Sequence, residues 1–293
     1  MNLNTVITAL ITPFTKNFTL YLEGLMNLVD FQMGNGVKAF FICGTYGSGP
    51  LMSVAERKKV AEALISYVGG KATVIVHVGA NNVDDTLDLA RHAESIGADA
   101  IASVPPYYYV YDDAAILNYF SKLVSEVKIP VFLYNNPART GVKISSELVR
   151  RLSEVGVVGV KDSSFDLVRF YEDMAVVDGK DFKFIIGTEA LMLPAIMAGA
   201  MTAVSGLSNT FPELVVKLYN LIKMGMYSEA VKVQLDVIKV RRVLHLVPTI
   251  PAVYEVLRMR GIDVGYPKPP LRTLNTKEVE LIRDGLMRIG MLR

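Results

Sequence analysis

The chain has 293 residues, of which 51% are hydrophobic and 20% are charged, and its formal net charge is +2 at pH 7. This composition predicts a large buried core and argues against a disordered chain. The balanced charge, without a block of basic residues, argues against nucleic-acid binding.

Three further features bear on location and cofactors. No apolar run reaches the roughly 18 residues of a transmembrane helix, and the first residues lack the pattern of a signal peptide. The single cysteine, Cys43, fits a reducing compartment, and the three histidines show no metal-ligand spacing. We therefore expect a cytoplasmic protein with no membrane partner, no metal and no other cofactor.

Eight short apolar runs recur along the chain, and each is nearly continuous in hydrophobic character. Such runs are typical of parallel strands that are buried on both faces. They lie at residues 6–11, 39–43, 73–78, 100–104, 131–134, 157–160, 182–186 and 202–205.

Helical patterns fill most of the intervals. Apolar residues share one face between residues 22 and 33, and Ser53 with Glu56 forms a capping box before the next helix. Similar stripes are found at residues 87–93, 116–127 and 145–154. After residue 212 the patterns predict helices at 214–223, 227–244, 249–260 and 276–289.

The alternation of strands and helices predicts an α/β protein built on a (β/α)8 TIM barrel. A doubly wound sheet is the competing arrangement, but no GxGxxG sequence follows the first strand. We expect the barrel to span residues 1–224, with the helix at 214–223 as its eighth. A C-terminal helical extension, residues 225–293, is expected to pack on the barrel without a linker.

Lys161 follows the sixth apolar run, at the end of the strand where barrel enzymes place their functional side chains. A lysine with the usual pKa of about 10.4 is almost fully protonated at pH 7, whereas burial lowers that pKa and provides a neutral amine. Such an amine can attack a carbonyl and form a Schiff base. The alternative is a surface lysine that begins a helix and pairs with Asp162.

The residues that follow the other predicted strands each allow a functional and a purely structural interpretation. The glycines of residues 44–50 could bring backbone amides to an anion or form a tight turn. The tyrosines at 107–109 could serve packing, an interface or catalysis. Tyr134 could relay a proton, and Arg139 could bind a carboxylate or form a loop salt bridge. Residues 187–189 and 205–209 could line a pocket or only form turns.

Four motifs together resemble those of the dihydrodipicolinate synthase / N-acetylneuraminate lyase superfamily, in the same order and spacing. They are Gly44-Thr45-x-Gly47, Pro106-Tyr107-Tyr108, Tyr134-Asn135-x-Pro137-x-Arg139-Thr140-Gly141 and Gly159-Val160-Lys161-Asp162. The resemblance covers the whole chain. It implies a barrel enzyme that forms a Schiff base with pyruvate or another 2-oxo acid, needs no metal, and assembles as a homotetramer, a dimer of dimers.

The resemblance also implies catalytic roles. Lys161 resembles the lysine that condenses with the substrate ketone, and Tyr134 resembles the phenol that shuttles protons and contacts the substrate carboxylate. Thr45 and Tyr108 resemble its relay partners. Tyr107 resembles a neighbour that crosses a subunit interface in some members, and the assignment between Tyr107 and Tyr108 stays open.

Five residues are implied to bind substrate, and Tyr107 is one of them. Gly187 resembles a pocket glycine, and Val204 resembles the residue whose backbone faces bound pyruvate. Tyr46 stands where members typically carry a second small hydroxyl residue that helps to hold the pyruvate carboxylate, so a reshaped pocket is expected. Arg139 resembles the arginine with which the synthases bind an amino-aldehyde substrate.

Signals of two branches are present. Ser48-Gly49-Pro50 and residues 263–270 resemble archaeal 2-keto-3-deoxygluconate aldolases, whereas Arg139 resembles the synthases. The leading hypothesis is a class I aldolase that reversibly cleaves a 2-keto-3-deoxy sugar acid to pyruvate and an aldehyde. The alternative is 4-hydroxy-tetrahydrodipicolinate synthase, which joins pyruvate and aspartate semialdehyde. A non-catalytic 2-oxo acid binding protein, motivated by Tyr46, is the third hypothesis.

Overall fold

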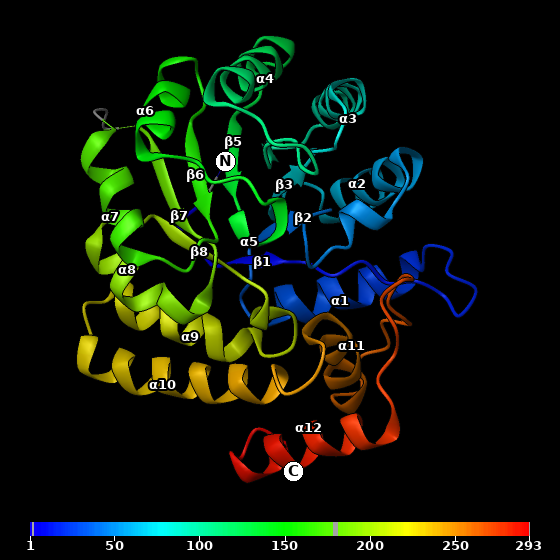
Figure 1. Ribbon diagram of the computed structural model, residues 1–293. Coiled ribbons are helices and arrows are strands. Elements are labelled where there is room, and N and C mark those ends of the chain that lie inside the picture. The colour runs from blue at the N-terminus through cyan, green and yellow to red at the C-terminus, as the bar shows by residue number, and fades with distance from the viewer. Residues whose placement is uncertain (2, 178–180, 293) are drawn as a thin grey trace.

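The computed structural model describes residues 1, 3–177 and 181–292, and within them eight parallel strands close into a barrel in chain order (Figure 1). This architecture confirms the predicted (β/α)8 barrel. The strands are β1 Ile7–Ala9, β2 Ala39–Ile42, β3 Thr73–His77, β4 Ala100–Ser103, β5 Val131–Asn135, β6 Gly159–Asp162, β7 Lys183–Ile186 and β8 Thr202–Ser205.

Helices surround the barrel, and α9 follows β8 as the expected eighth outer helix. The helices are α1 Leu22–Gly34, α2 Val54–Val68, α3 Val83–Ser95, α4 Asp113–Glu126, α5 Pro137–Thr140, α6 Ser146–Glu154, α7 Leu167–Val176, α8 Met192–Ala198, α9 Pro212–Lys223, α10 Tyr227–Leu244, α11 Thr249–Met259 and α12 Thr276–Arg288. The described residues also form short 3-10 helices, which are η1 Gly49–Leu51, η2 Glu189–Leu191 and η3 Leu207–Asn209.

The structure departs from the sequence patterns between residues 157 and 200. It contains α7 and α8, which the patterns did not predict. α7 begins after Asp166, whose side chain caps the helix by accepting a hydrogen bond from the backbone of Arg169. α8 has only seven residues, too few to display a helical period. β6 also lies two residues later than predicted, so Lys161 belongs to the strand itself.

Strand register decides which side chains face the barrel interior. Successive residues of a strand point to opposite faces, so Leu133 and Val160 pack between the barrel and its helices while Tyr134 joins the inner apolar layer. Tyr134 pairs with Lys161, and Lys161 pairs with Ile185. Because Tyr134 and Ile185 both belong to the inner layer, Lys161 points into the barrel as well.

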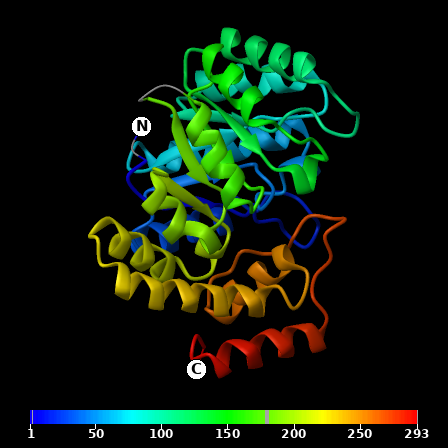
Figure 2. The same cartoon turned by 60° about the vertical axis from the view of Figure 1, so that its left-hand side comes forward.

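The C-terminal helices cover one side of the barrel, as Figures 1 and 2 show. α10 packs against α8, α9 and η2, and α12 packs against α10 and α11. Gln234 attaches α10 to the loop after β7, because its amide donates to the Glu189 carbonyl at 3.0 Å and accepts from the Leu193 backbone at 3.1 Å. α10 therefore runs past the carboxyl ends of β7 and β8. Within the described residues, no helix combines the length and apolar character needed to cross a membrane.

Candidate active site

A cavity of about 190 Å³ opens at the carboxyl ends of the strands. Seven of the nine residues that the sequence singled out line it, namely Thr45, Tyr46, Tyr134, Arg139, Lys161, Gly187 and Val204. A second, adjoining cavity of about 280 Å³ shares Thr45, Tyr134 and Arg139 with the first and is also lined by Tyr107. The barrel therefore brings together residues that are up to 159 positions apart in sequence (45 to 204).

Lys161 is 4% exposed, and its amine lies between two aromatic rings. Its Nζ is 3.8 Å from the ring centroid of Phe41 and 3.6 Å from that of Tyr134. Burial lowers the pKa of Lys161, although Tyr134 opposes this shift. The neighbouring Asp162 points away and binds Asn135 and Ser164 instead. No ion pair joins Lys161 to a carboxylate in the part of the chain that the structure describes, so Lys161 is not a surface lysine paired with Asp162.

The hydroxyl of Tyr134 belongs to a small hydrogen-bond network. Its Oη lies 3.1 Å from Oγ1 of Thr45, where either oxygen can donate, and accepts from Nδ2 of Asn136 at 2.9 Å. Burial raises the pKa of Tyr134, but the Lys161 ammonium and these hydrogen bonds outweigh it, and the net pKa is lowered. Tyr134 is therefore suited to exchange a proton with a group bound beside Lys161.

Tyr46 fills the space beside β8. Its ring packs on Gly206, where a Cβ atom would lie 2.3 Å from the ring Cζ. Burial raises the pKa of Tyr46, as does nearby Glu189, whereas Arg241 and Arg139 lower it. Tyr46 thus lies among one carboxylate and two guanidinium groups, and its ring reshapes the cavity as expected.

Tyr107 and Tyr108, which follow β4, occupy different environments. Tyr107 is partly buried in the cavity beside Tyr134. Tyr108 is 84% exposed, packs its ring on that of Tyr109 at a centroid distance of 5.1 Å, and has a φ of 86°. A positive φ is strained for a side chain of this size. Within a single chain, Tyr108 does not reach the relay in which the sequence placed it.

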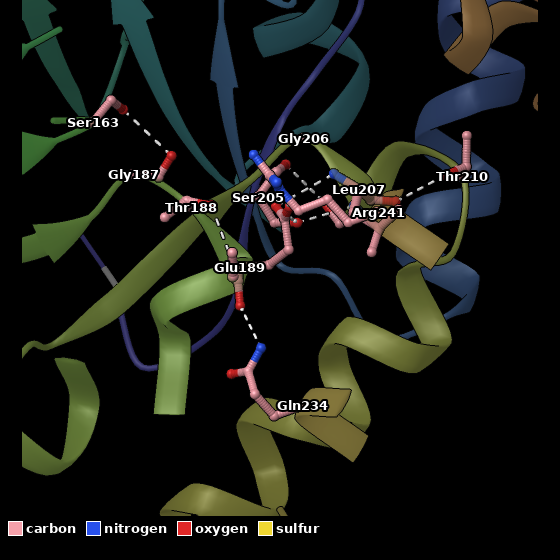
Figure 3. Close-up of polar contacts among 12 residues, drawn as sticks. Ser163, Gly187, Thr188, Glu189, Ser205, Gly206, Leu207, Thr210, Gln234 and Arg241 are labelled. Carbon is pink, nitrogen blue, oxygen red and sulfur yellow. Dashed lines mark hydrogen bonds and ion pairs between the residues drawn. The ribbon is translucent and has the colours of Figure 1, made fainter. Parts of the chain in front are cut away.

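Gly187 and Val204 shape the floor of the cavity. A Cβ at Gly187 would lie 2.6 Å from the Asp162 carbonyl oxygen, so a glycine is needed where β7 ends against β6. The hydroxyl of Ser163 donates to the Gly187 carbonyl at 3.3 Å (Figure 3). Val204 is 2% exposed and belongs to the inner layer of the barrel.

Several lining residues were not among the predicted site residues. They include Asn136, Phe165, Arg241 and His245. Arg241 comes from α10, seven residues after buried Gln234 and four after buried Val237. A charged residue on the buried face of an amphipathic helix is the sequence signal that could have found it. Within the described ranges, no group of three or more His, Cys, Asp or Glu residues is arranged to hold a metal.

Comparisons with known proteins agree with this fold. The family model described as the dihydrodipicolinate synthetase family matches residues 2–288. A 4-hydroxy-tetrahydrodipicolinate synthase of Methanopyrus kandleri is 34% identical over 98% of this chain and 96% of its own length. An uncharacterized DapA-like lyase of Halobacterium salinarum is 32% identical over 100% of this chain and 96% of its own.

Two solved structures illustrate the likeness in three dimensions. YagE from E. coli K12, a prophage protein of the dihydrodipicolinic acid synthase family solved with pyruvate, gives a TM-score of 0.94 at 25% identity, with 98% of each chain covered. Dihydrodipicolinate synthase from Aquifex aeolicus gives a TM-score of 0.92 at 28% identity, again with 98% of each chain covered.

The barrel and the matches over its whole length define a lyase of the (β/α)8 class. The chain belongs to the dihydrodipicolinate synthetase family, as the motifs around Thr45, Tyr134 and Lys161 indicated.

Proposed function

We propose that Lys161 forms a Schiff base with pyruvate or a closely related 2-oxo acid. Through this imine the enzyme forms or breaks a carbon–carbon bond between the 2-oxo acid and an aldehyde. The observation that carries this proposal is the burial of Lys161 beside the hydroxyl network of Tyr134, without a carboxylate partner among the described residues. Burying a lysine without a counter-ion costs stability, and such residues cluster at functional sites.

The proposed reaction begins when the neutral amine of Lys161 attacks C2 of the 2-oxo acid, and loss of water gives a protonated imine. The imine withdraws electrons from C3, so loss of a C3 proton gives an enamine that adds to the aldehyde carbon. The reverse electron flow breaks the C3–C4 bond. Tyr134 can hold the proton that the aldehyde oxygen gains or loses. Hydrolysis of the imine then releases the product and restores Lys161.

For the aldehyde, the 4-hydroxy-tetrahydrodipicolinate synthase reaction stands first, in which pyruvate condenses with aspartate semialdehyde. The relative from M. kandleri carries that name, and Arg139 lines the same cavity as Lys161. Cleavage of a 2-keto-3-deoxy sugar acid, which the sequence motifs put first, is the second candidate. Tyr46 favours it, because a ring in place of a compact hydroxyl changes the shape of the cavity.

The imine is tested by reduction with borohydride in the presence of pyruvate, followed by peptide mass spectrometry. We expect one pyruvyl group on Lys161 and none in Lys161→Arg. Lys183→Arg is the matched control, because Lys183 lies at the opposite, amino-terminal end of the neighbouring strand β7. An unmodified Lys161 in folded protein contradicts the covalent mechanism.

The aldehyde is tested by measuring pyruvate consumption with aspartate semialdehyde, glyceraldehyde and glyceraldehyde 3-phosphate, one at a time. Preferred turnover of aspartate semialdehyde supports the synthase, and preferred turnover of either glyceraldehyde supports the aldolase. Trapping of pyruvate on Lys161 without turnover of any aldehyde would support the binding-protein hypothesis that Tyr46 raised.

A further inference from the structure

We propose that Arg241 is a specificity-determining residue, which binds an anionic group at the far end of the aldehyde that reacts at Lys161. The shared chemistry is a carboxylate or a phosphate. This inference rests on the proposed function for its reaction, although the binding of an anion at Arg241 does not itself require an imine.

The position of Arg241 comes from the C-terminal extension. Its side chain leaves α10, is 26% exposed, and lines the same cavity as Lys161 and Arg139. It also lines a smaller adjoining cavity with His245 and Thr249. α10 therefore contributes a cation to a site whose sequence-predicted residues all come from barrel strands or from the segments that directly follow them.

Glu189 lies on the Nε side of the Arg241 guanidinium. The Nε of Arg241 lies 3.6 Å from Oε1 of Glu189 (Figure 3). Glu189 is itself held, because its Oε2 accepts a hydrogen bond from the hydroxyl of Ser205 at 2.8 Å and a longer one from the Leu207 backbone at 3.5 Å. Since the guanidinium is planar and its Nε faces Glu189, the edge that carries the two terminal nitrogens is left for another partner.

No hydrogen bond to those terminal nitrogens is found in the described part of the chain. The contact to Glu189 is longer than a hydrogen bond, and the ring centroid of Phe165 lies 5.4 Å from Cζ. The charge of Arg241 also acts on Tyr46 and His245, which are neutral neighbours at the cavity. A guanidinium binds carboxylate and phosphate oxygens through two parallel N–H donors. Arg241 thus offers the donor geometry that such an anion needs.

Attachment of α10 to the barrel does not explain Arg241. Gln234 already performs that role through two hydrogen bonds of 3.0 and 3.1 Å to the η2 region. The Arg241–Glu189 contact joins α10 to η2, but at 3.6 Å it adds little attachment, and both residues also line the cavity. An anchoring residue would not need to leave most of its donors unpaired at a cavity wall.

The charge and size of the cavity narrow the substrate class. Arg139, Arg241 and Lys161 line it together with a single described carboxylate, that of Glu189, so the cavity favours anions. Its volume of about 190 Å³ suits a short aldehyde of a few carbons. One short molecule can therefore place its carbonyl at the imine and its anionic end at Arg241.

The test compares Arg241→Gln with Arg242→Gln. Arg242 is the next residue of α10 but is exposed, so this control removes the same charge away from the cavity. We expect Arg241→Gln to raise KM for the anionic aldehyde that the enzyme uses by about 10- to 100-fold, the effect of one lost charge-assisted contact. KM for neutral glyceraldehyde and borohydride trapping of pyruvate are expected to change less than about twofold. Aspartate semialdehyde and glyceraldehyde 3-phosphate distinguish a carboxylate from a phosphate.

Arg241→Lys controls for a folding defect, because it keeps the positive charge. Its KM for the anionic aldehyde is expected to lie between those of wild type and Arg241→Gln. The proposal is overturned if Arg241→Gln raises KM equally for neutral and anionic aldehydes, or if it behaves like Arg242→Gln. If borohydride traps no pyruvate on the wild-type protein, the imine mechanism is wrong. Calorimetric titration with inorganic phosphate and with succinate then tests whether Arg241 binds anions. Binding that is lost in Arg241→Gln but kept in Arg242→Gln supports it, and equal binding by both variants overturns it.

Discussion

At the scale of single residues, Lys161 and Tyr134 form a coupled pair of titratable groups inside the barrel. Burial lowers the pKa of Lys161, and the proximity of Tyr134 partly restores it. Burial raises the pKa of Tyr134, but Lys161, Thr45 and Asn136 together lower it further than burial raises it. The amine of Lys161 therefore loses its proton more readily than a lysine in water, and the phenol of Tyr134 loses its proton more readily than a tyrosine in water.

The pH dependence of imine formation follows from these shifts. Only the neutral amine attacks, so borohydride trapping of pyruvate should rise with pH and reach its plateau below the usual lysine pKa near 10.5. In Tyr134→Phe the group that favours the Lys161 ammonium is removed, so the midpoint should move to still lower pH. Turnover should nevertheless fall by about 10²- to 10⁴-fold, because the proton relay is lost.

Tyr119→Phe is the matched control for that variant. Tyr119 is also buried, and its hydroxyl is hydrogen-bonded to Ser103 and Thr86, but it does not line the cavity of Lys161. Its trapping profile should coincide with wild type. An upward shift of the midpoint in Tyr134→Phe would contradict the electrostatic coupling of Tyr134 to Lys161.

At the scale of elements, α10 connects the C-terminal extension to the site. Gln234 binds the η2 region, and Arg241, two turns later on the same helix, reaches the cavity. The strand ends supply Lys161, Tyr134 and Thr45, as in other barrels, whereas α10 supplies a residue that strand patterns do not reveal. The placement of Arg241 depends on how firmly α10 is held against η2.

Gln234→Leu tests that attachment. The variant leaves the Glu189 carbonyl and the Leu193 amide without their present partner, so we expect a loss of about 1–3 kcal/mol in the free energy of unfolding. Lys232→Leu introduces the same side chain on the exposed face of α10 and should change stability by less than about 0.5 kcal/mol. Denaturant unfolding of both variants measures the difference, and equal stabilities would show that Gln234 is not an anchor.

At the scale of the whole molecule, an exposed apolar segment follows β4. Tyr108 is 84% exposed, Tyr109 is 69% exposed, and Val110 is fully exposed at 101%. Large apolar side chains clustered on a surface mark an interface. We propose that this segment contacts a second copy of the chain in the homotetramer that the family resemblance implies, where the strained backbone of Tyr108 would be held in place.

Val110→Asp is expected to weaken that association, because it buries a charge in an apolar interface. Sedimentation equilibrium should give the wild-type assembly a mass near four times that of the 32.2 kDa chain, and the variant a smaller one. Leu281→Asp, which changes an exposed apolar residue of α12, should leave the mass unchanged. A fully active wild-type monomer would contradict both the interface and the tetramer.

The sequence by itself determined the barrel, its family and the pairing of Lys161 with Tyr134 and Thr45. Continuous apolar runs specify strands buried on both faces, and a closed barrel brings their carboxyl ends together. The domain division at residue 224 stays a prediction. Periodicity missed α8 because its seven residues are too few to repeat, whereas α7 has ten residues and an Asp166 cap, which are signals that the sequence does carry.

Only the tertiary structure decided three features of the site. It placed Tyr107 in the cavity and Tyr108 on the surface. The sequence cannot distinguish these two positions, because both are tyrosines and they are adjacent. The tertiary structure packed the ring of Tyr46 on Gly206, a contact across 160 positions of sequence (46 to 206). It brought Arg241 from α10 to the cavity that Lys161 lines. Such contacts depend on how distant elements pack, whereas strand and helix patterns depend on neighbours along the chain.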